Sequence, residues 1–199
     1  MAKETFTTLN NNSAASDPGQ INLSPTKLQR LRPDLFGFGA VLDFALTFLL
    51  VRSFPHKKMI REALRGGDSR AAVVMSTEPL IVAAYTDELD CVAMLKFDSS
   101  LAADYQLKPG SKLLTVNTYW QGKVVRDLTA GPGTYGRYGN FSPMIADFLT
   151  DDAERLQTRK KQIDKAEWQR TWELGRAYLK ATPDRARDGR PIFSMNPAR

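Results

Sequence analysis

Cysteine and histidine are almost absent from this chain of 199 residues, which contains one of each, Cys91 and His56. A single cysteine excludes a disulfide within the chain and any metal site built from several thiolates. A single histidine excludes a mechanism that needs two imidazoles. No family signature surrounds either residue, so we expect Cys91 to be a small buried apolar residue and His56 to be solvated. We expect no cofactor and no bound metal.

Phosphate-binding and nucleophile motifs are also missing. The chain has no G-x-x-x-x-G-K-[ST] loop, no G-x-G-x-x-G between a strand and a helix, and no G-x-S-x-G elbow. These absences argue against nucleotide-dependent enzymes and triad hydrolases. The opening MAKETFTTLNNN lacks the apolar core of a secretory signal, so we expect a cytoplasmic protein.

The longest apolar run, GFGAVLDFALTFLLVR at positions 37–52, is too short to cross a bilayer, which takes roughly 20 apolar residues. Its interior polar residues, Asp43 and Thr47, lie four apart and so share one helical stripe. This pattern predicts a buried core helix with one polar edge. A membrane partner is not expected.

Hydrophobic residues make up 42% of the chain and charged residues 25%, as in soluble globular proteins. The formal net charge of +6 is uneven: residues 1–70 carry +4, residues 71–150 carry −2 and residues 151–199 carry +4. Positive ends attract polyanions such as nucleic acid or an acidic protein. The same excess also serves solubility.

The sequence predicts an α+β fold with a roughly five-stranded, mainly antiparallel sheet, covered by N-terminal helices and followed by a long C-terminal helix. A flexible arm over 1–23 precedes a single domain over 24–182, and a tail covers 183–199. The domain divides into a helical part (24–66), a sheet (71–128), a Gly/Tyr loop (131–143) and the long helix (151–181). Ser24-Pro25 is typical of a helix start, with Ser as the N-cap.

Short apolar runs predict strands at 71–76, 80–86, 91–97, 112–120 and 123–128. The connections between the first three are too short for parallel pairing, which needs a crossover of about a dozen residues. Adjacent antiparallel strands are therefore expected there, with Gln121-Gly122 as a hairpin turn.

The Gly/Tyr loop and the C-terminal helix are the candidate binding elements. The loop presents aromatic and cationic side chains that could stack on bases or contact phosphate. Basic residues also line the helix after Pro55 (Lys57, Lys58, Arg61 and Arg65) and the first half of the long helix, which we expect to project. The candidate partner- or nucleic-acid-binding residues are Tyr135, Arg137, Tyr138, Phe141, Arg155, Arg159, Lys160, Lys161 and Lys165.

Three carboxylates, Asp87, Glu88 and Asp90, lie together in the turn between two predicted strands. Converging carboxylates can bind a cation or do acid–base work. A turn of this composition is more often solvated. The residues therefore form a possible carboxylate cluster, to which no catalytic role is assigned.

Three functions follow from these patterns. The first is a non-catalytic interaction or assembly protein, which binds itself or a protein partner through the Gly/Tyr loop and the long C-terminal helix. The second is a nucleic-acid-binding protein that uses the basic helices and the Tyr/Arg loop. The third is an enzyme of unfamiliar type built on the carboxylate cluster; the question of catalysis stays open, with the balance toward a non-catalytic protein.

Overall fold

The computed structural model describes residues 17–36, 54–120, 138 and 140–191. The helices are α1 (Pro25–Leu31), α3 (Phe54–Gly66), α4 (Ser100–Asp104), α5 (Ala153–Gln162) and α6 (Lys165–Ala181), with short 3₁₀ turns at Pro33–Leu35 and Ala146–Phe148. The strands are β1 (Asp68–Thr77), β2 (Leu80–Thr86), β3 (Cys91–Phe97), β4 (Lys112–Trp120), β5 (Asn140–Ile145) and β6 (Arg187–Asp188).

The strands form one sheet in the order β5-β4-β1-β2-β3-β6, antiparallel except for the parallel pair β3–β6. The predicted α+β class and the mainly antiparallel sheet are confirmed, with six strands in place of five. The expected strand at 123–128 and its hairpin turn lie outside the described residues. Strands β5 and β6 were not expected: β5 begins in the predicted Gly/Tyr loop and continues beyond it, and β6 lies in the predicted tail.

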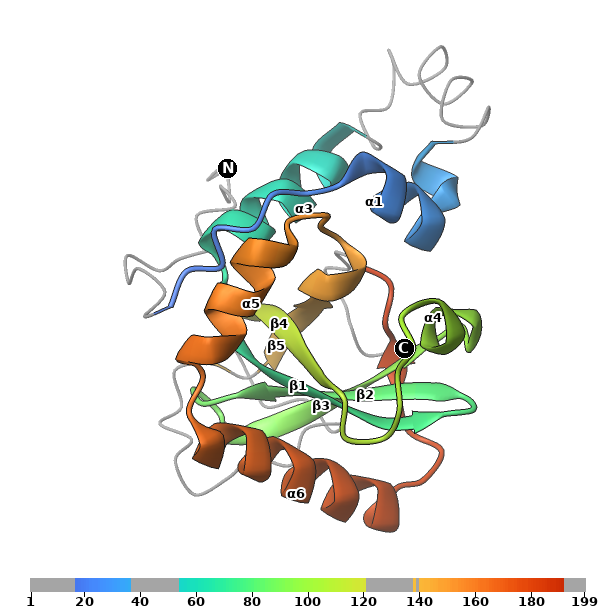
Figure 1. Cartoon of the computed structure of the whole chain (residues 1–199), viewed down its shortest axis with the longest axis vertical. Helices are drawn as coiled ribbons and strands as arrows, with labels where there is room; N and C mark the ends of the chain where they lie inside the picture. The colour runs from blue at the N-terminus through green and yellow to red at the C-terminus, as the bar shows by residue number, and fades with distance from the viewer. Residues whose placement is uncertain (1–16, 37–53, 121–137, 139, 192–199) are drawn as a thin grey trace, which may run out of the picture.

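Each face of the sheet is covered by its own set of helices, and β1 shows the division by strict alternation (Figure 1). Ala72 and Val74 point into a core formed with α1, α3, α4 and α5. Val73 and Met75 point the other way, into a core formed with α6. Because successive side chains of a strand point to opposite faces, β1 contributes to the cores on both sides of the sheet. The predicted covering by N-terminal helices is confirmed.

The long C-terminal helix is present as α6, but the predicted span 151–181 is divided in two. Ile163 is extended, and the Asp164 side chain accepts a hydrogen bond from the Ala166 amide, which caps a new helix. Ile163 packs against both cores. The break thus carries the chain from one face of the sheet to the other, and α5 packs through Leu156 where we expected a projecting helix.

The described part of the expected flexible arm is packed against the body. The amides of Gly19 and Ile21 donate to the carbonyls of Gly67 and Leu64, and Ile21 is fully buried. Ser24 caps α1 as predicted, accepting from the Lys27 amide. The apolar run 37–52 lies outside the described residues, and none of the described helices is long and apolar enough to cross a membrane.

Candidate functional site

Strands β1 and β2 separate at one end of the sheet. Their ladder ends at the pair Ala72–Ala84, whereas β1 stays paired with β4 as far as Asp68. Side chains form hydrogen bonds with the backbone groups that this separation leaves without a partner strand. The Ala71 amide donates to the Glu167 carboxylate over 2.7 Å, and the Asn117 amide group donates to the Tyr85 carbonyl over 2.8 Å. The gap is therefore a polar seam inside an otherwise apolar sheet.

Arg70 occupies this seam with only 11% of its side chain exposed. Its Nε lies 2.8 Å from Asp68 Oδ2 and its Nη2 lies 2.5 Å from Asp87 Oδ2. Its Nη1 lies 3.6–3.7 Å from carboxylate oxygens of Asp17 and Glu167. One guanidinium thus joins the N-terminal segment, β1, the β2–β3 turn and α6. A buried cation with several carboxylate partners is costly to disturb, because each partner depends on it.

Two of the carboxylates around Arg70, Asp68 and Glu167, have raised pKa values, chiefly because they are buried. Burial raises the pKa of Asp68, and Arg70 acts in the opposite direction. Burial likewise raises the pKa of Glu167, against the hydrogen bond from Ala71. Tyr119 donates its hydroxyl to Asp68 over 3.1 Å, and burial holds its pKa well above the ordinary value. Burial therefore disfavours the ionised forms of Asp68 and Glu167, and Arg70 counteracts this effect.

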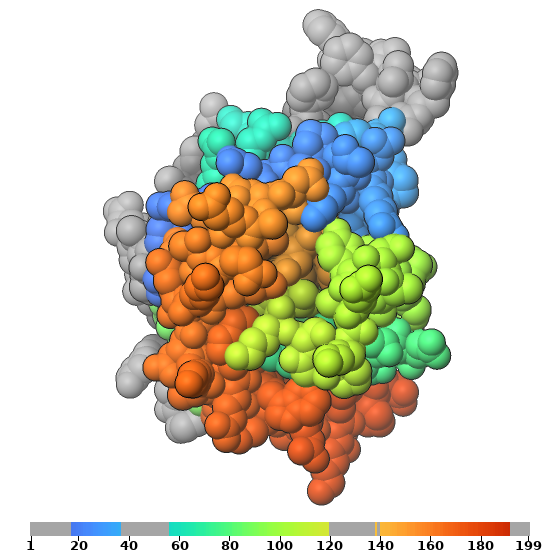
Figure 2. All heavy atoms as spheres, viewed as in Figure 1, coloured from blue at the N-terminus to red at the C-terminus, as the bar shows by residue number. Residues whose placement is uncertain are grey.

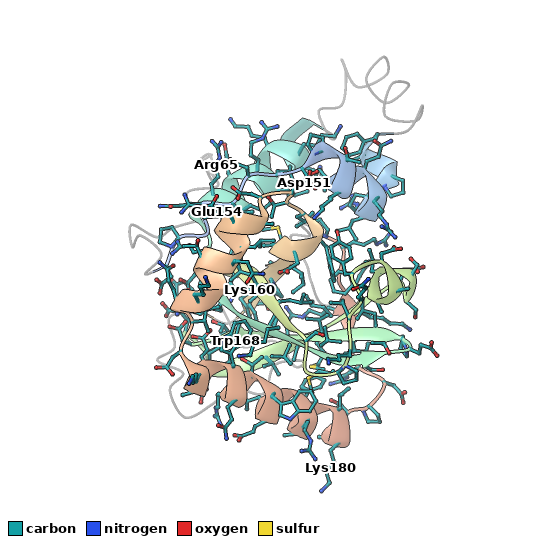
Figure 3. The ribbon with its side chains drawn as sticks, in the orientation of Figure 1. Arg65, Asp151, Glu154, Lys160, Trp168 and Lys180 are labelled. Carbon is teal, nitrogen blue, oxygen red and sulfur yellow. The ribbon has the colours of Figure 1, made fainter. Side chains whose placement is uncertain are left out.

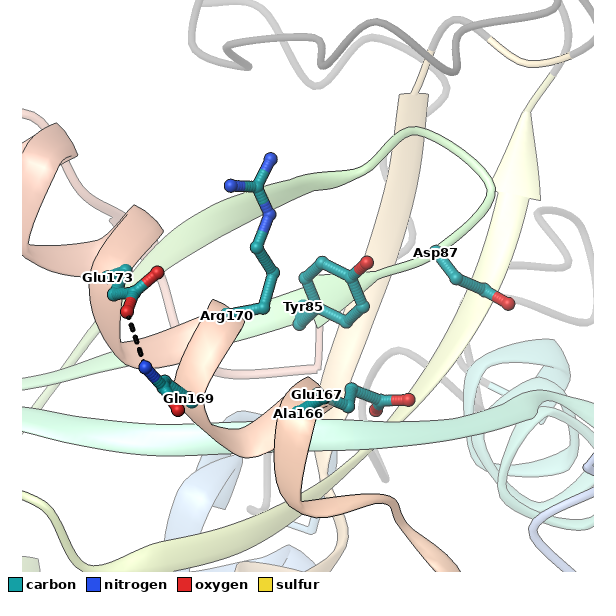
Figure 4. Close-up of a pocket in the computed structure, with 7 residues that line it drawn as sticks. All are labelled: Tyr85, Asp87, Ala166, Glu167, Gln169, Arg170 and Glu173. Atoms are coloured by element: carbon teal, nitrogen blue, oxygen red, sulfur yellow. Dashed lines mark hydrogen bonds between the residues drawn. The ribbon is translucent and has the colours of Figure 1, made fainter.

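A pocket of about 460 Å³ lies beside the seam, between the end of β2 and α6 (Figure 4). Its lining is Tyr85, Asp87, Ala166, Glu167, Gln169, Arg170 and Glu173. Arg170 makes a bidentate contact with Asp90, at 2.6 and 3.1 Å, and this hydrogen bonding lowers the pKa of Asp90. Tyr85 also donates to Asp90. Three charged residues of the pocket wall are thus paired with residues outside the lining: Asp87 and Glu167 with Arg70, and Arg170 with Asp90.

The predicted carboxylate cluster does not converge on one point. Asp87 is paired with Arg70, Asp90 is paired with Arg170, and Glu88 is exposed. Within the ranges that the structure describes, no group of three or more His, Cys, Asp or Glu residues is placed to hold a metal ion. The turn therefore supplies partners to two arginines of different elements.

A second charged surface forms where α3 and α5 flank the N-terminal segment (Figures 1 and 3). Each helix carries four Lys or Arg residues and one Glu, a net of +3, so the two helices together hold +6, the net charge of the whole chain. Arg65 donates to the Asn22 side chain over 3.2 Å, and Arg159 donates to the Gly19 carbonyl over 3.4 Å. Both helices thus direct an arginine onto the same segment.

We name this surface the cationic strip and define it as Arg61 and Arg65 of α3 with Arg155 and Arg159 of α5. The members of each pair lie four residues apart and so share a helix face. The α3 arginines are exposed and the α5 arginines half-buried. In the view of Figure 2, atoms of the N-terminal segment lie directly against α5, so the surface between the helices is closed. Four arginines on two helices that flank one segment are suited to contact an extended polyanion.

The structure separates the basic residues predicted on the long helix. Lys160 points inward, where its Nζ lies 2.5 Å from Asp147 Oδ1. Lys161 is exposed on α5, whereas Lys165 begins α6 after the break. Only Arg155 and Arg159 of that set join the cationic strip. Their partners from α3 lie some 90 positions earlier in the chain, which is why the combination was not predicted.

The described aromatic residues of the Gly/Tyr loop are part of the fold. Tyr138 is buried and stacks on Tyr119 at a centroid distance of 4.9 Å, and Phe141 is fully buried in β5. Neither is presented to a partner or a base as we expected. Tyr135 and Arg137 lie outside the described residues.

The seam around Arg70 was missed at the level of sequence. Its signal is Asp68-Ser69-Arg70, a polar opening directly before the apolar run of β1, which lies outside the predicted strand 71–76. Glu167 was not among the candidate site residues. A charged side chain that enters a buried strand requires partners, and that requirement could have indicated a buried ion-pair network.

Comparisons with known proteins gave no match at any of three levels. No family model matches the chain, no curated protein matches it, and no solved structure matches it.

Proposed function

We propose that this protein is a non-catalytic nucleic-acid-binding protein that contacts phosphate groups through the cationic strip. The observation that carries the proposal is the convergence of Arg65 and Arg159, from helices far apart in sequence, on the segment Gly19–Asn22. Guanidinium groups bind phosphate through planar, bidentate contacts. The proposed setting is the reducing cytoplasm, in keeping with the buried thiol of Cys91.

The strip supports affinity more than sequence specificity. Phosphate contacts position a protein on a duplex, and base contacts specify the sequence. The described aromatic side chains Tyr138 and Phe141 are buried in the fold and do not extend the strip. We therefore expect binding that depends steeply on salt and only weakly on base sequence.

Fluorescence anisotropy with a labelled DNA duplex tests this proposal. In the double variant Arg65→Ala/Arg159→Ala, the slope of log K against log salt falls by about 1.8, since each lost phosphate contact removes about 0.9. The matched control is Arg176→Ala/Lys180→Ala, which removes the same charge from exposed positions of α6. This control leaves the slope within about 0.5 of wild type.

Two outcomes contradict the proposal. One is the absence of binding to duplex or single-stranded DNA and RNA even at low salt. The other is an equal change of slope in both double variants, which means that total charge rather than the strip governs binding.

A second candidate function is assembly with a copy of itself or with a protein partner through α6. The observation in its favour is that Trp172, Leu174 and Leu179 are only partly buried against the sheet. Tryptophan often contributes a large share of the binding energy of a protein interface, and Trp172 is the candidate here. Light scattering across a range of concentrations tests self-assembly, and a constant monomer mass argues against it.

A further inference from the structure

The chain ends its described part with a short segment that returns from α6 to the sheet (Figure 1). We call residues Arg187–Pro191 the strap. It pairs with β3 through the parallel matches Leu95–Arg187 and Lys96–Asp188. The Gly189 amide then donates to the Lys96 carbonyl over 2.9 Å. The strap thus extends the sheet by one very short strand.

The side chain of Arg187 reaches from β6, which is paired with β3, to β5, the strand at the opposite end of the sheet order. It donates to the Phe141 carbonyl over 2.7 Å and to Asn140 Oδ1 over 2.9 Å. Its guanidinium also lies 5.9 Å from the centroid of the Phe141 ring. The sheet therefore curls until β3 and β5 approach each other, and one arginine side chain bridges them.

The position of Gly189 has no room for a side chain. A Cβ built on Gly189 would overlap the ring of Phe97. This ring cannot easily move away, because it is buried and packs edge-on against Phe148 at a centroid distance of 5.1 Å. Only glycine fits at this position. Two residues further on, the Pro191 carbonyl accepts from Arg32 over 2.7 Å.

Of the remaining strap residues, Pro191 is buried, whereas Asp188 and Arg190 are exposed and pair with each other. The strap is therefore recognised by main-chain hydrogen bonds, one arginine, one obligatory glycine and a buried proline. Main-chain pairing with selection at alternate side chains is how extended peptides are recognised at sheet edges.

We propose that Lys96, Phe97, Asn140, Phe141 and Arg32 form a binding site for an extended peptide with an arginine two residues before a glycine. In this structure the chain's own strap fills the site. The strap is covalently attached, so its effective concentration is high, and a peptide added in trans competes poorly with it. A partner that carries this pattern binds when the strap is released.

The variant Gly189→Ala tests the proposal on the full-length chain. It excludes the strap from the site without changing any residue of the site itself. A labelled peptide with the sequence of residues 185–191, RARDGRP, is titrated by fluorescence anisotropy. We expect it to bind Gly189→Ala at least about tenfold more tightly than wild type, since the attached competitor is gone.

Two peptide controls define specificity. RARDARP keeps the charge of the first peptide but adds the methyl group that Phe97 excludes, and RAADGRP lacks the bridging arginine. Both are expected to lose about tenfold or more in affinity. The control protein is Gly66→Ala, because a Cβ at Gly66 meets no atom within 4 Å and the strap stays docked.

Equal binding of RARDGRP and RARDARP overturns the proposal, because it indicates attraction of charge alone. Equal binding of RARDGRP to Gly189→Ala and Gly66→Ala overturns it as well. If circular dichroism shows that Gly189→Ala is unfolded, Arg187→Ala serves as the receptor with the open site. The cationic strip is unchanged in all these proteins, so this result is independent of DNA binding.

Discussion

Replacing Arg70 by methionine tests whether the buried guanidinium holds the separated strands together. The substitution keeps an unbranched side chain but removes the charge that faces Asp68 at 2.8 Å. The Asp68 side chain is only 4% exposed, so water cannot replace the lost cation. Breaking a buried pair in this way costs about 3–5 kcal/mol. At about 2–4 °C per kcal/mol for a chain of this size, the Tm falls by about 6–20 °C.

We expect the stability lost in Arg70→Met to depend on pH. Burial raises the pKa of both Asp68 and Glu167 in the folded state, so the folded chain gains stability from protonation as the pH falls. Arg70 lowers both pKa values, and without it this proton uptake begins at higher pH. The deficit of Arg70→Met is therefore largest near pH 7 and shrinks as the pH falls toward about 5.

Arg170→Met is the matched control for a solvent-facing arginine. Arg170 is 42% exposed and Asp90 is 24% exposed, so the loss of their pair costs at most about 1 kcal/mol. The deficit of this variant also shrinks as the pH falls, but only in a more acidic range, because the pKa of Asp90 is lowered whereas those of Asp68 and Glu167 are raised. Hydrogen bonding from Arg170 lowers the pKa of Asp90, so the stabilisation is present above the unfolded pKa and is lost as the pH falls.

Urea denaturation followed by tryptophan fluorescence at several pH values measures both variants. Our account of the seam is refuted if Arg70→Met loses no more stability than Arg170→Met near pH 7. A deficit of Arg70→Met that is constant with pH contradicts the assigned role of Asp68 and Glu167.

Two further substitutions test the packing of the C-terminal helices. In Gly175→Ala the new Cβ would lie 2.9 Å from Ala83 Cβ, which cannot turn away, and 2.8 Å from Met75 Sδ, so α6 must move and stability falls by about 1–3 kcal/mol despite the better helix propensity of alanine. Lys160→Met leaves Asp147, 11% exposed, without its cation and costs about 3 kcal/mol, whereas Lys161→Met at an exposed position changes stability by less than about 0.5 kcal/mol. Thermal melts followed by circular dichroism measure these variants with Gly66→Ala as the glycine control. The packing described is contradicted if Gly175→Ala loses no more stability than Gly66→Ala, or if Lys160→Met loses no more than Lys161→Met.

The local structure follows from local sequence. Ser24-Pro25 begins α1 because a serine side chain caps exposed amides and proline has no amide to satisfy. The runs 80–86 and 91–97 form β2 and β3 with the predicted bounds, because short apolar segments between turn residues favour extended backbone. The four residues between them are too few for a crossover, so the antiparallel pairing was also predictable.

Tertiary structure decided the charged surfaces and the placement of α5 and α6. The partners of Arg70 come from positions 17, 68, 87 and 167, and no spacing rule relates them. The break at Asp164 carried a sequence signal, an acidic cap three residues before Glu167. The placement of α5 and α6 on opposite faces of the sheet, which results from this break, carried no such signal.

The physical reason is the range of the interactions. Dihedral preferences, caps and hydrophobic periodicity act over a few residues, and so the sequence by itself determined the helices, the central strands and the α+β class. The buried state of Phe141 and the docking of Gly189 beneath Phe97 depend on how far the sheet curls. That curl results from packing between layers, which only the folded chain sets.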